Sequence, residues 1–328
     1  MKLFPSREPR SKWRWMTITE LLMLATKHTS SYMRGMRQLP LEKRVMILNM
    51  LVEGMSMRSI SRTVGCSINT VTKLLVDAGN ACLDFHDETV VGVKSKRIEC
   101  DEIWSFCYAK QRRADEAGMP DWAGDVWTWT SIDADSKLMV NWFVGGRDAE
   151  FAQHFMLDLA ARLDNRVQLT TDGHKAYLTA VEGAFGNDID FAQLVKLYGQ
   201  APGGKGHERK YSPAQCNGTK KRTVTGSPDK AKVSTSYAER QNLTMRMSMR
   251  RFTRLTNAFS KKFDNHCHAL ALYFVFYNFC RKHKTLGTSP AVAAGLTDTV
   301  HDMAWIVGLI DAANPPKKRG PYKKQSAS

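Results

Sequence analysis

The sequence predicts an α/β protein in which a mixed β-sheet follows a small all-helical unit. Apolar residues recur at helical spacing between residues 39 and 79, and near residue 97 the period changes to the alternation of strands. Three strands with short connections come first, and helix and strand then alternate. With 328 residues, of which 43% are hydrophobic, the chain is long enough for a buried core and for two or three domains.

Residues 39–95 are expected to form a three-helix unit. The apolar spacing predicts one helix before residue 54, a second over 57–64 and a third over 68–78. Each boundary has a residue suited to a helix start, a cap or a turn, namely Pro40, Gly54, Ser56, Gly65 and Ser67. Two helices joined by a short glycine-containing turn form a helix-turn-helix, whose second helix reads the major groove of DNA.

Short polar and basic residues occupy the exposed positions of the second and third predicted helices. Such side chains suit contacts with base edges and phosphates. The expected DNA-binding residues are Arg58, Arg62, Ser67, Asn69, Thr70 and Lys73. A helical bundle with no DNA role is the alternative interpretation.

The next region has the pattern of an antiparallel meander followed by α/β units. The predicted strands are 98–108, 126–132, 138–144, 166–170 and 189–197, and the predicted helices are 148–163 and 174–185. A basic, glycine-rich stretch over 199–226 is expected to be an exposed loop, and a long helix is expected to run from Ser236 past Arg250. This order of elements is that of the ribonuclease H-like α/β fold.

The charge is unevenly distributed along the chain, whose formal net charge is +16. Residues 198–262 contain 15 Lys and Arg against 3 Asp and Glu, whereas residues 98–197 contain 9 against 17. An enzyme that uses metal ions on nucleic acid needs carboxylates for the cations and a basic surface for the phosphates. A solvated charged face on an ordinary protein would also give such blocks.

Three carboxylates stand at positions that the predicted fold would bring together. Asp101 lies in the middle of the first strand, Asp172 ends the fourth, and Glu239 lies on the first turn of the last long helix. Three carboxylates can hold two Mg²⁺ or Mn²⁺ ions for phosphoryl transfer, and no His or Cys ligand is required.

Each of these carboxylates also has an ordinary explanation. Asp101 could face water, and Asp172 could be a turn residue before a glycine. Glu239 could complete a capping box with Ser236, in which case Glu102 and Asp133 become the next candidates for the third ligand.

Five segments of the sequence form distinctive motifs, namely CDEIWSFCYAK, GDVWTWTSIDADSKL, LTTDGHKAY, STSYAERQNLTMRMSMRRFTRLTNAFSKK and YNFCRKHKTLGTSPA. These motifs resemble those of bacterial DDE transposases of the insertion-sequence-one-like group. The resemblance implies a ribonuclease H-like core that cuts and joins the ends of a mobile DNA element, with Asp101, Asp172 and Glu239 as metal ligands. The interval from Asp172 to Glu239 is longer than in compact members of the group because of the inserted basic stretch.

A basic stripe follows Glu239 in the sequence. Arg246, Arg250 and Arg254 recur at i, i+4 with Arg240 nearby, so we expect these residues to hold the DNA strand beside the metal site. The complete domain prediction is a basic N-terminal segment (1–38), a helix-turn-helix domain (39–95), a catalytic domain (96–290) with a basic insertion (199–226), and a C-terminal cap with a basic tail (291–328).

The function predicted from the sequence is that of a transposase which binds the terminal repeats of a mobile element. Its partners would be double-stranded DNA, both element ends and target, and further copies of itself on that DNA. No apolar run approaches the ~20 residues that span a bilayer, so we expect no membrane partner and a place in the bacterial cytoplasm with the nucleoid. The alternatives are a catalytically silent DNA-binding regulator and a nuclease that cuts without joining.

Overall fold

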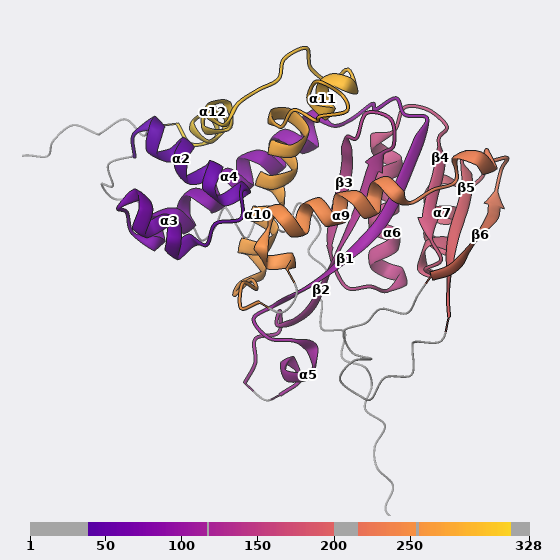
Figure 1. The fold of residues 1–328 in the computed structure, drawn as a ribbon, viewed down its shortest axis with the longest axis horizontal. Coiled ribbons are helices and arrows are strands. Elements are labelled where there is room, and N and C mark those ends of the chain that lie inside the picture. The colour runs from indigo at the N-terminus through magenta and orange to yellow at the C-terminus, as the bar shows by residue number, and fades with distance from the viewer. Residues whose placement is uncertain (1–38, 117, 200–215, 254–255, 316–328) are drawn as a thin grey trace, which may run out of the picture.

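The computed structural model describes residues 39–116, 118–199, 216–253 and 256–315 (Figure 1). A group of helices stands at one end of a mixed six-stranded sheet. The predicted N-terminal segment, Arg254 and the basic tail beyond residue 315 lie outside the described residues. No helix in the described part of the chain combines the length and apolar character needed to cross a membrane.

The sheet has the strand order β3-β2-β1-β4-β5-β6. Its strands are β1 (Arg97–Cys107), β2 (Gly124–Asp133), β3 (Met139–Gly145), β4 (Gln168–Asp172), β5 (Asp190–Tyr198) and β6 (Cys216–Thr225). The first three strands pair antiparallel, and β1, β4 and β5 pair parallel. This is the ribonuclease H-like order with one strand added at the edge, and it confirms the predicted fold class.

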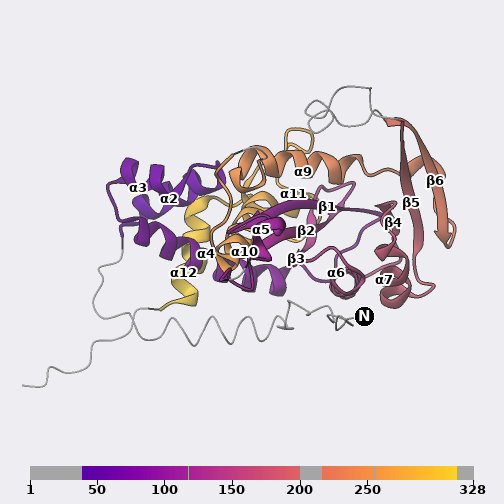
Figure 2. The same ribbon diagram turned by 90° about the horizontal axis from the view of Figure 1, so that it is seen from below.

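Helices cover both faces of the sheet (Figure 2). The helix α9 (Ser236–Ser248) lies against β1 and β2, while α6 (Ala149–Arg162) and α7 (Ala176–Phe185) lie on the opposite face. Asp148 caps α6 as predicted, because its Oδ1 accepts hydrogen bonds from the backbone amides of Glu150 and Phe151. A short helix, α5 (Gln111–Ala114), lies in the connection between β1 and β2.

The added strand corrects part of the predicted loop over 199–226. Residues 216–225 form β6, which pairs antiparallel with β5. Most of its side chains are exposed, including Lys220, Lys221 and Arg222. An edge strand tolerates basic side chains because it needs no apolar face, so the hydrophobic pattern that marks the inner strands is missing here.

The N-terminal helices are α2 (Leu41–Val52), α3 (Met57–Val64) and α4 (Ile68–Thr89). Ser56 and Ser67 accept capping hydrogen bonds from the amides of Ser59 and Asn69, and Gly65 adopts φ 67° in the turn between α3 and α4. All three residues therefore act as predicted.

The helix α4 continues eleven residues beyond its predicted end at Ala78. Its second half packs against α10 (Phe263–Val275), and Gly79 permits the contact, since a Cβ there would lie 2.4 Å from the Cβ of His268. Gly79 thus marks a close approach between two helices rather than the end of one.

The long helix predicted from Ser236 past Arg250 is wrong in its length. The helix α9 ends at Ser248, Met249 is extended at φ −128° and ψ 97°, and residues 250–252 form a separate 3₁₀ turn. Met249 and Phe252 are buried, so the chain turns here to place both apolar side chains in the core. Arg246 and Arg250 therefore do not share one helical stripe.

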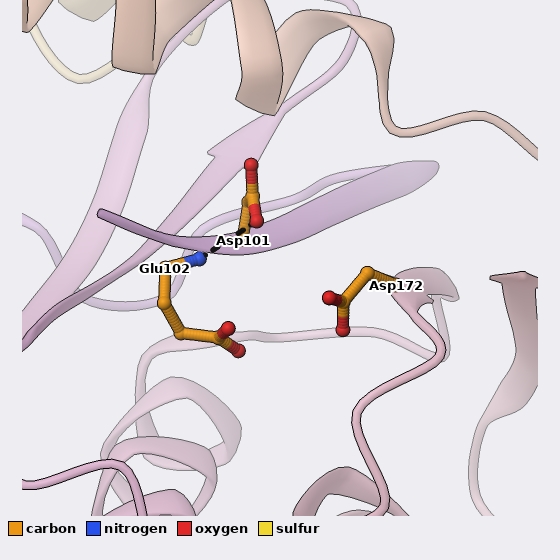
Figure 3. Close-up of side chains that lie close together, drawn as sticks. All are labelled: Asp101, Glu102 and Asp172. Carbon is orange, nitrogen blue, oxygen red and sulfur yellow. Dashed lines mark hydrogen bonds between the residues drawn. The ribbon is translucent and has the colours of Figure 1, made fainter. Parts of the chain in front are cut away.

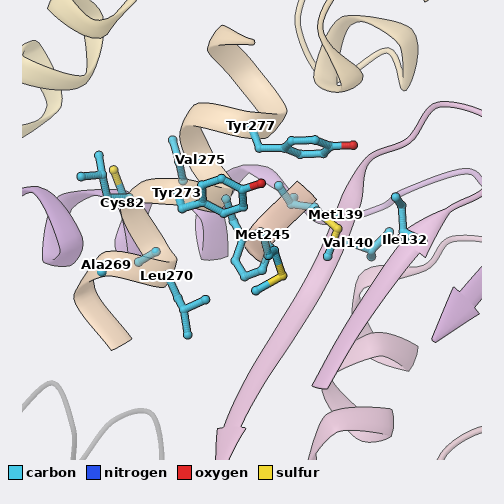
Figure 4. Packing of buried hydrophobic residues seen from close by; sticks show 14 of the residues in the cluster. Cys82, Ile132, Met139, Val140, Met245, Ala269, Leu270, Tyr273, Val275 and Tyr277 are labelled. Carbon is cyan, nitrogen blue, oxygen red and sulfur yellow. The ribbon is translucent and has the colours of Figure 1, made fainter. Parts of the chain in front are cut away.

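The N-terminal helices and the sheet are joined by one hydrophobic core (Figure 4). It includes Cys82 of α4, Met139 of β3, Met245 of α9 and Leu270 of α10. The short helix α11 (Pro290–Ala293) follows α10 and its π-helical extension, and α12 (Met303–Ala313) packs on α2 and α4. All seven cysteines are free thiols.

Candidate active site

An acidic cluster lies where β1 and β4 run side by side (Figure 3). Asp101 comes from the middle of β1 and Asp172 from the last residue of β4. Among the described residues, Asp101, Glu102 and Asp172 can bring one ligand atom each to within 4.8 Å of one another. The structure therefore brings together the two aspartates that the sequence predicted, and adds Glu102.

Asp101 is held from two sides. Its Oδ1 accepts a hydrogen bond of 2.9 Å from the backbone amide of Glu102, and its Oδ2 accepts one of 2.8 Å from Nδ2 of Asn242 on α9. Burial raises the pKa of Asp101 to about 6, and the negative charges of Asp172 and Glu239 act in the same direction. A cation placed among these carboxylates would relieve that repulsion.

Glu102 points away from Asp101, as neighbouring residues of a strand do, but its longer side chain brings the carboxylate back toward Asp172 (Figure 3). Its side chain is 1% exposed, and its Oε2 accepts hydrogen bonds of 3.2 and 3.1 Å from Nε and Nη2 of Arg147. Burial raises the pKa of Glu102 to about 7, and the charge of Asp172 adds to the effect. The sequence predicts Glu102 as a ligand only if Glu239 is a helix cap.

Glu239 lies beside the cluster rather than within it. Its Oε1 accepts a hydrogen bond of 2.5 Å from Oγ1 of Thr235 and lies 2.7 Å from Nζ of Lys196 on β5. The carboxylate is close enough to Asp101 to raise the pKa of that residue. Lys196 was not predicted, because β5 also contains Asp190 and Gln193 and a further charged residue in that strand is no distinct signal.

The capping-box explanation of Glu239 does not hold. The N-cap residue of α9 is Thr235, and the amide of Ser236 donates to Oγ of Ser234. The first turn is capped instead by Glu99 of β1, whose Oε2 accepts hydrogen bonds from the amides of Tyr237 and Ala238 at 2.7 and 3.1 Å. This capping glutamate lies 138 residues away in the sequence, so no local motif could reveal it.

Asp133, the other reserve candidate, is a turn residue. Its Oδ1 accepts hydrogen bonds from the backbone amides of Asp135 and Ser136 after β2. It is not part of the acidic cluster.

The predicted DNA-binding residues fall on two separate parts of the fold. Arg58 and Arg62 are exposed on α3, Ser67 and Asn69 are exposed at the start of α4, and Thr70 and Lys73 are half-buried. Lys73 lies 2.5 Å from Asp77 in an i, i+4 ion pair. In the second group Arg240 and Arg250 are exposed and Arg246 is half-buried, while Arg254 lies outside the described residues.

The donor set fits a hard divalent cation. Asp101, Glu102 and Asp172 offer only carboxylate oxygens, with Glu239 nearby. Mg²⁺ and Mn²⁺ prefer such oxygens, whereas zinc sites use Cys and His. Burial and the neighbouring carboxylates raise the pKa values of Asp101 and Glu102, and a bound cation would favour the ionised form of both.

No protein-family model matches the chain, and no curated protein sequence matches it. Among solved structures, the chain is similar to the piggyBac transposase in a synaptic complex with hairpin DNA, at 10% identity and a TM-score of 0.37, over 88% of this chain and 75% of that one. It is also similar to the Mos1 strand transfer complex, at 11% identity and a TM-score of 0.21, over 53% of this chain and 64% of that one. The chain thus spans less than two thirds of Mos1. These likenesses are too distant to carry an argument about function, which must rest on the chain's own residues.

Proposed function

We propose that the protein is a DDE-type DNA transposase that binds the ends of a mobile element, cuts one strand and joins it to target DNA. The observation that carries the proposal is the meeting of Asp101 and Asp172 between two parallel strands, with Glu239 beside them on α9. Burial raises the pKa of Asp101, and a buried carboxylate placed beside a second carboxylate is costly for folding alone. Binding of a divalent cation gives that arrangement a purpose.

In this proposal Asp101, Asp172 and Glu239 hold two Mg²⁺ or Mn²⁺ ions. Such ions supply an activated water and stabilise the leaving oxygen when a phosphodiester is cut. Asn242 and the Glu102 amide orient the Asp101 carboxylate, and Glu99 fixes the start of the helix that carries Glu239. The freed 3′-hydroxyl then attacks target DNA at the same site.

DNA recognition is assigned to the α3–α4 pair and to the basic residues near α9. The exposed side chains at the start of α4 suit the terminal repeats, and Arg240, Arg246 and Arg250 suit the backbone of the strand being cut. The protein would act as a homo-oligomer on DNA in the bacterial cytoplasm, on nucleoid DNA.

The test uses the purified full chain with a labelled duplex carrying the inverted repeat that brackets the gene, a target plasmid and Mg²⁺. We expect nicks with 3′-hydroxyl ends followed by joined products. Asp172→Asn should abolish both steps while the duplex is still bound, because the variant loses one metal ligand and one negative charge near phosphate. Asp121→Asn, at an exposed position in the connection before β2, is the matched control.

The same assay separates the two alternatives. Cutting without joined product would identify a nuclease of the same fold. Sequence-specific binding with no cutting in either metal would identify a catalytically silent regulator.

A further inference from the structure

Arg147 stands beside the acidic cluster and was not part of the predicted site. It directly precedes Asp148, the N-cap of α6. Its Nε and Nη2 donate to Oε2 of Glu102, and Nη2 lies 3.9 Å from Oδ2 of Asp172. Its guanidinium carbon lies 4.5 Å from the centroid of the Trp127 ring.

This guanidinium is fixed in place from several directions. Hydrogen bonds between charged groups and stacking on an aromatic ring both restrict an arginine side chain. The backbone before it is also constrained, because a Cβ at Gly145 would lie 1.9 Å from the ring of Phe151. Strand β3, the turn and α6 together place Arg147 at a defined position beside Asp172.

The two side chains of the Arg147–Glu102 ion pair differ in their exposure to solvent. The Glu102 side chain is 1% exposed, whereas that of Arg147 is 36% exposed. Arg147 donates to Glu102 through Nε and Nη2, which leaves the Nη1 side of the guanidinium outside that pair. A guanidinium held by a buried carboxylate on one side can bind an anion on the other, and its planar fork matches a phosphate.

We propose that Arg147 binds a phosphate of the DNA strand at the acidic cluster, and that Glu102 is a positioning residue for Arg147 rather than a metal ligand. The inference rests on the proposed function and names a substrate contact for it. Carboxylates repel a DNA phosphate, so a nearby fixed cation lowers the cost of bringing the strand to the site. The 3.9 Å separation from Asp172 places Arg147 where such a strand would pass.

The competing explanation is that Glu102 is the third metal ligand and that Arg147 only neutralises it until metal binds. The two explanations differ in which binding event each residue controls. If Glu102 positions Arg147, loss of the Glu102 charge weakens DNA binding more than metal binding. If Glu102 is a metal ligand, loss of the Glu102 charge weakens metal binding as strongly as loss of the Asp101 charge does.

The experiment compares Arg147→Gln, Arg147→Lys, Glu102→Gln and Asp101→Asn in the full chain, with Arg113→Gln on α5 as a control at an exposed arginine. Mn²⁺ affinity is measured without DNA by titration calorimetry. The DNA concentration that half-saturates the enzyme and the cleavage rate are measured in single-turnover reactions with a duplex of the element end. Thermal melting confirms that each variant is folded.

We expect Arg147→Gln to raise the half-saturating DNA concentration about tenfold. The slope of the logarithm of DNA affinity against the logarithm of salt concentration should become less steep by about one. Mn²⁺ affinity should change less than about threefold. Arg147→Lys should recover part of the loss. Glu102→Gln should leave Mn²⁺ affinity within about threefold of wild type, and Asp101→Asn should not. A single neutral methylphosphonate at the contacted position should weaken wild type but not Arg147→Gln, since that contact is already absent.

Two results would overturn the inference while the proposed function stands. One is a wild-type enzyme that cuts DNA no better than Arg147→Gln at every DNA concentration. The other is a Glu102→Gln variant that loses Mn²⁺ as severely as Asp101→Asn. A wild-type chain that binds Mn²⁺ but never cuts end DNA would instead overturn the proposed function, and this inference with it.

Discussion

Asn242 on α9 donates a hydrogen bond of 2.8 Å to Oδ2 of Asp101 on β1. Glu239 lies one turn earlier on the same helix, and Glu99, two residues before Asp101 on the same face of β1, caps the start of that helix. Two contacts between β1 and α9 therefore set the position of Glu239 relative to Asp101. The distance between these two carboxylates depends on side chains that are not themselves catalytic.

Replacement of Glu99 should disturb both folding and the site. Glu99→Leu leaves the amides of Tyr237 and Ala238 without their acceptor, which should cost about 1–3 kcal/mol of unfolding free energy. Cleavage should fall further than the lost stability explains, because α9 carries Glu239. Glu99→Gln keeps an acceptor oxygen, so it should retain most of the stability and most of the cleavage rate. Denaturant unfolding measures the stability and single-turnover assays measure the cleavage rate. Equal losses in Glu99→Leu and Glu99→Gln would contradict the positioning role of Glu99.

Glu239 should matter for chemistry and little for stability. Glu239→Gln keeps an acceptor for Thr235 but loses the ion pair with Lys196. The side chains of that pair are 32% and 41% exposed, so the ion pair contributes modestly to stability. We expect the free energy of unfolding to stay within about 1 kcal/mol of wild type, while the Mg²⁺-dependent cleavage rate falls by orders of magnitude. Ser236→Ala is the matched control and should keep most activity. An active Glu239→Gln enzyme would move the third metal ligand elsewhere.

The raised pKa of Asp101 predicts a pH dependence with a definite sign. Burial raises the pKa to about 6 in the folded chain, whereas an unfolded aspartate titrates near 3.9. Between these values the folded state binds the proton more tightly, so ionisation of Asp101 destabilises the fold as pH rises. The Asp101→Asn variant cannot ionise at this position, so it does not lose stability in this way as pH rises.

Without metal, the stability of Asp101→Asn relative to wild type should therefore increase from pH 4 to pH 7 by on the order of 1–3 kcal/mol, at 1.36 kcal/mol per pKa unit. Saturating Mg²⁺ should reduce the difference at pH 7, because it binds the ionised wild-type cluster. Urea unfolding at four pH values gives the comparison. A difference that is constant with pH would show that Asp101 titrates normally.

DNA reading by α4 should be tested in the full chain rather than in a fragment. A fragment of residues 39–95 would expose Leu75, Cys82 and other side chains that are buried in the shared core. We expect such a fragment to lack cooperative unfolding by circular dichroism. A fragment that melts cooperatively would contradict this dependence on α10 and α12.

In the full chain, Asn69→Ala should lower affinity for element-end DNA by about 1–3 kcal/mol and leave affinity for random DNA nearly unchanged. Arg62→Ala on the preceding helix should weaken both kinds of DNA together, as a phosphate contact does. Competition binding at physiological salt measures the ratio. Equal losses on both DNAs for Asn69→Ala would refute base reading at that position.

The sequence was sufficient for the order of β1 to β5 and for two residues of the acidic cluster. Alternating apolar residues identified β1 to β5, and the parallel pairing of β1 with β4 brings Asp101 and Asp172 together. Local capping rules also placed Ser56, Ser67 and Asp148 correctly, because the donors they satisfy lie within three residues.

The remaining features depend on contacts between distant segments. The end of α9 follows from burial of Met249 and Phe252, and the length of α4 follows from its packing on α10. The partners of Glu102 and Glu239, namely Arg147 and Lys196, come from other elements of the fold. No pattern of local spacing contains that information, since it arises only when the sheet and its helices are assembled.

The close contact between Gly79 and His268 has a consequence for how DNA would be handled. It holds α4, whose N-cap is Ser67, against α10, and both helices share one hydrophobic core with the strands of the sheet. A reader attached by a flexible linker would allow the cut to fall at variable distances from the bases it recognises. If the protein acts as proposed, the shared core keeps the two sites at a fixed separation, and the number of base pairs between the recognised sequence and the cut bond should be constant.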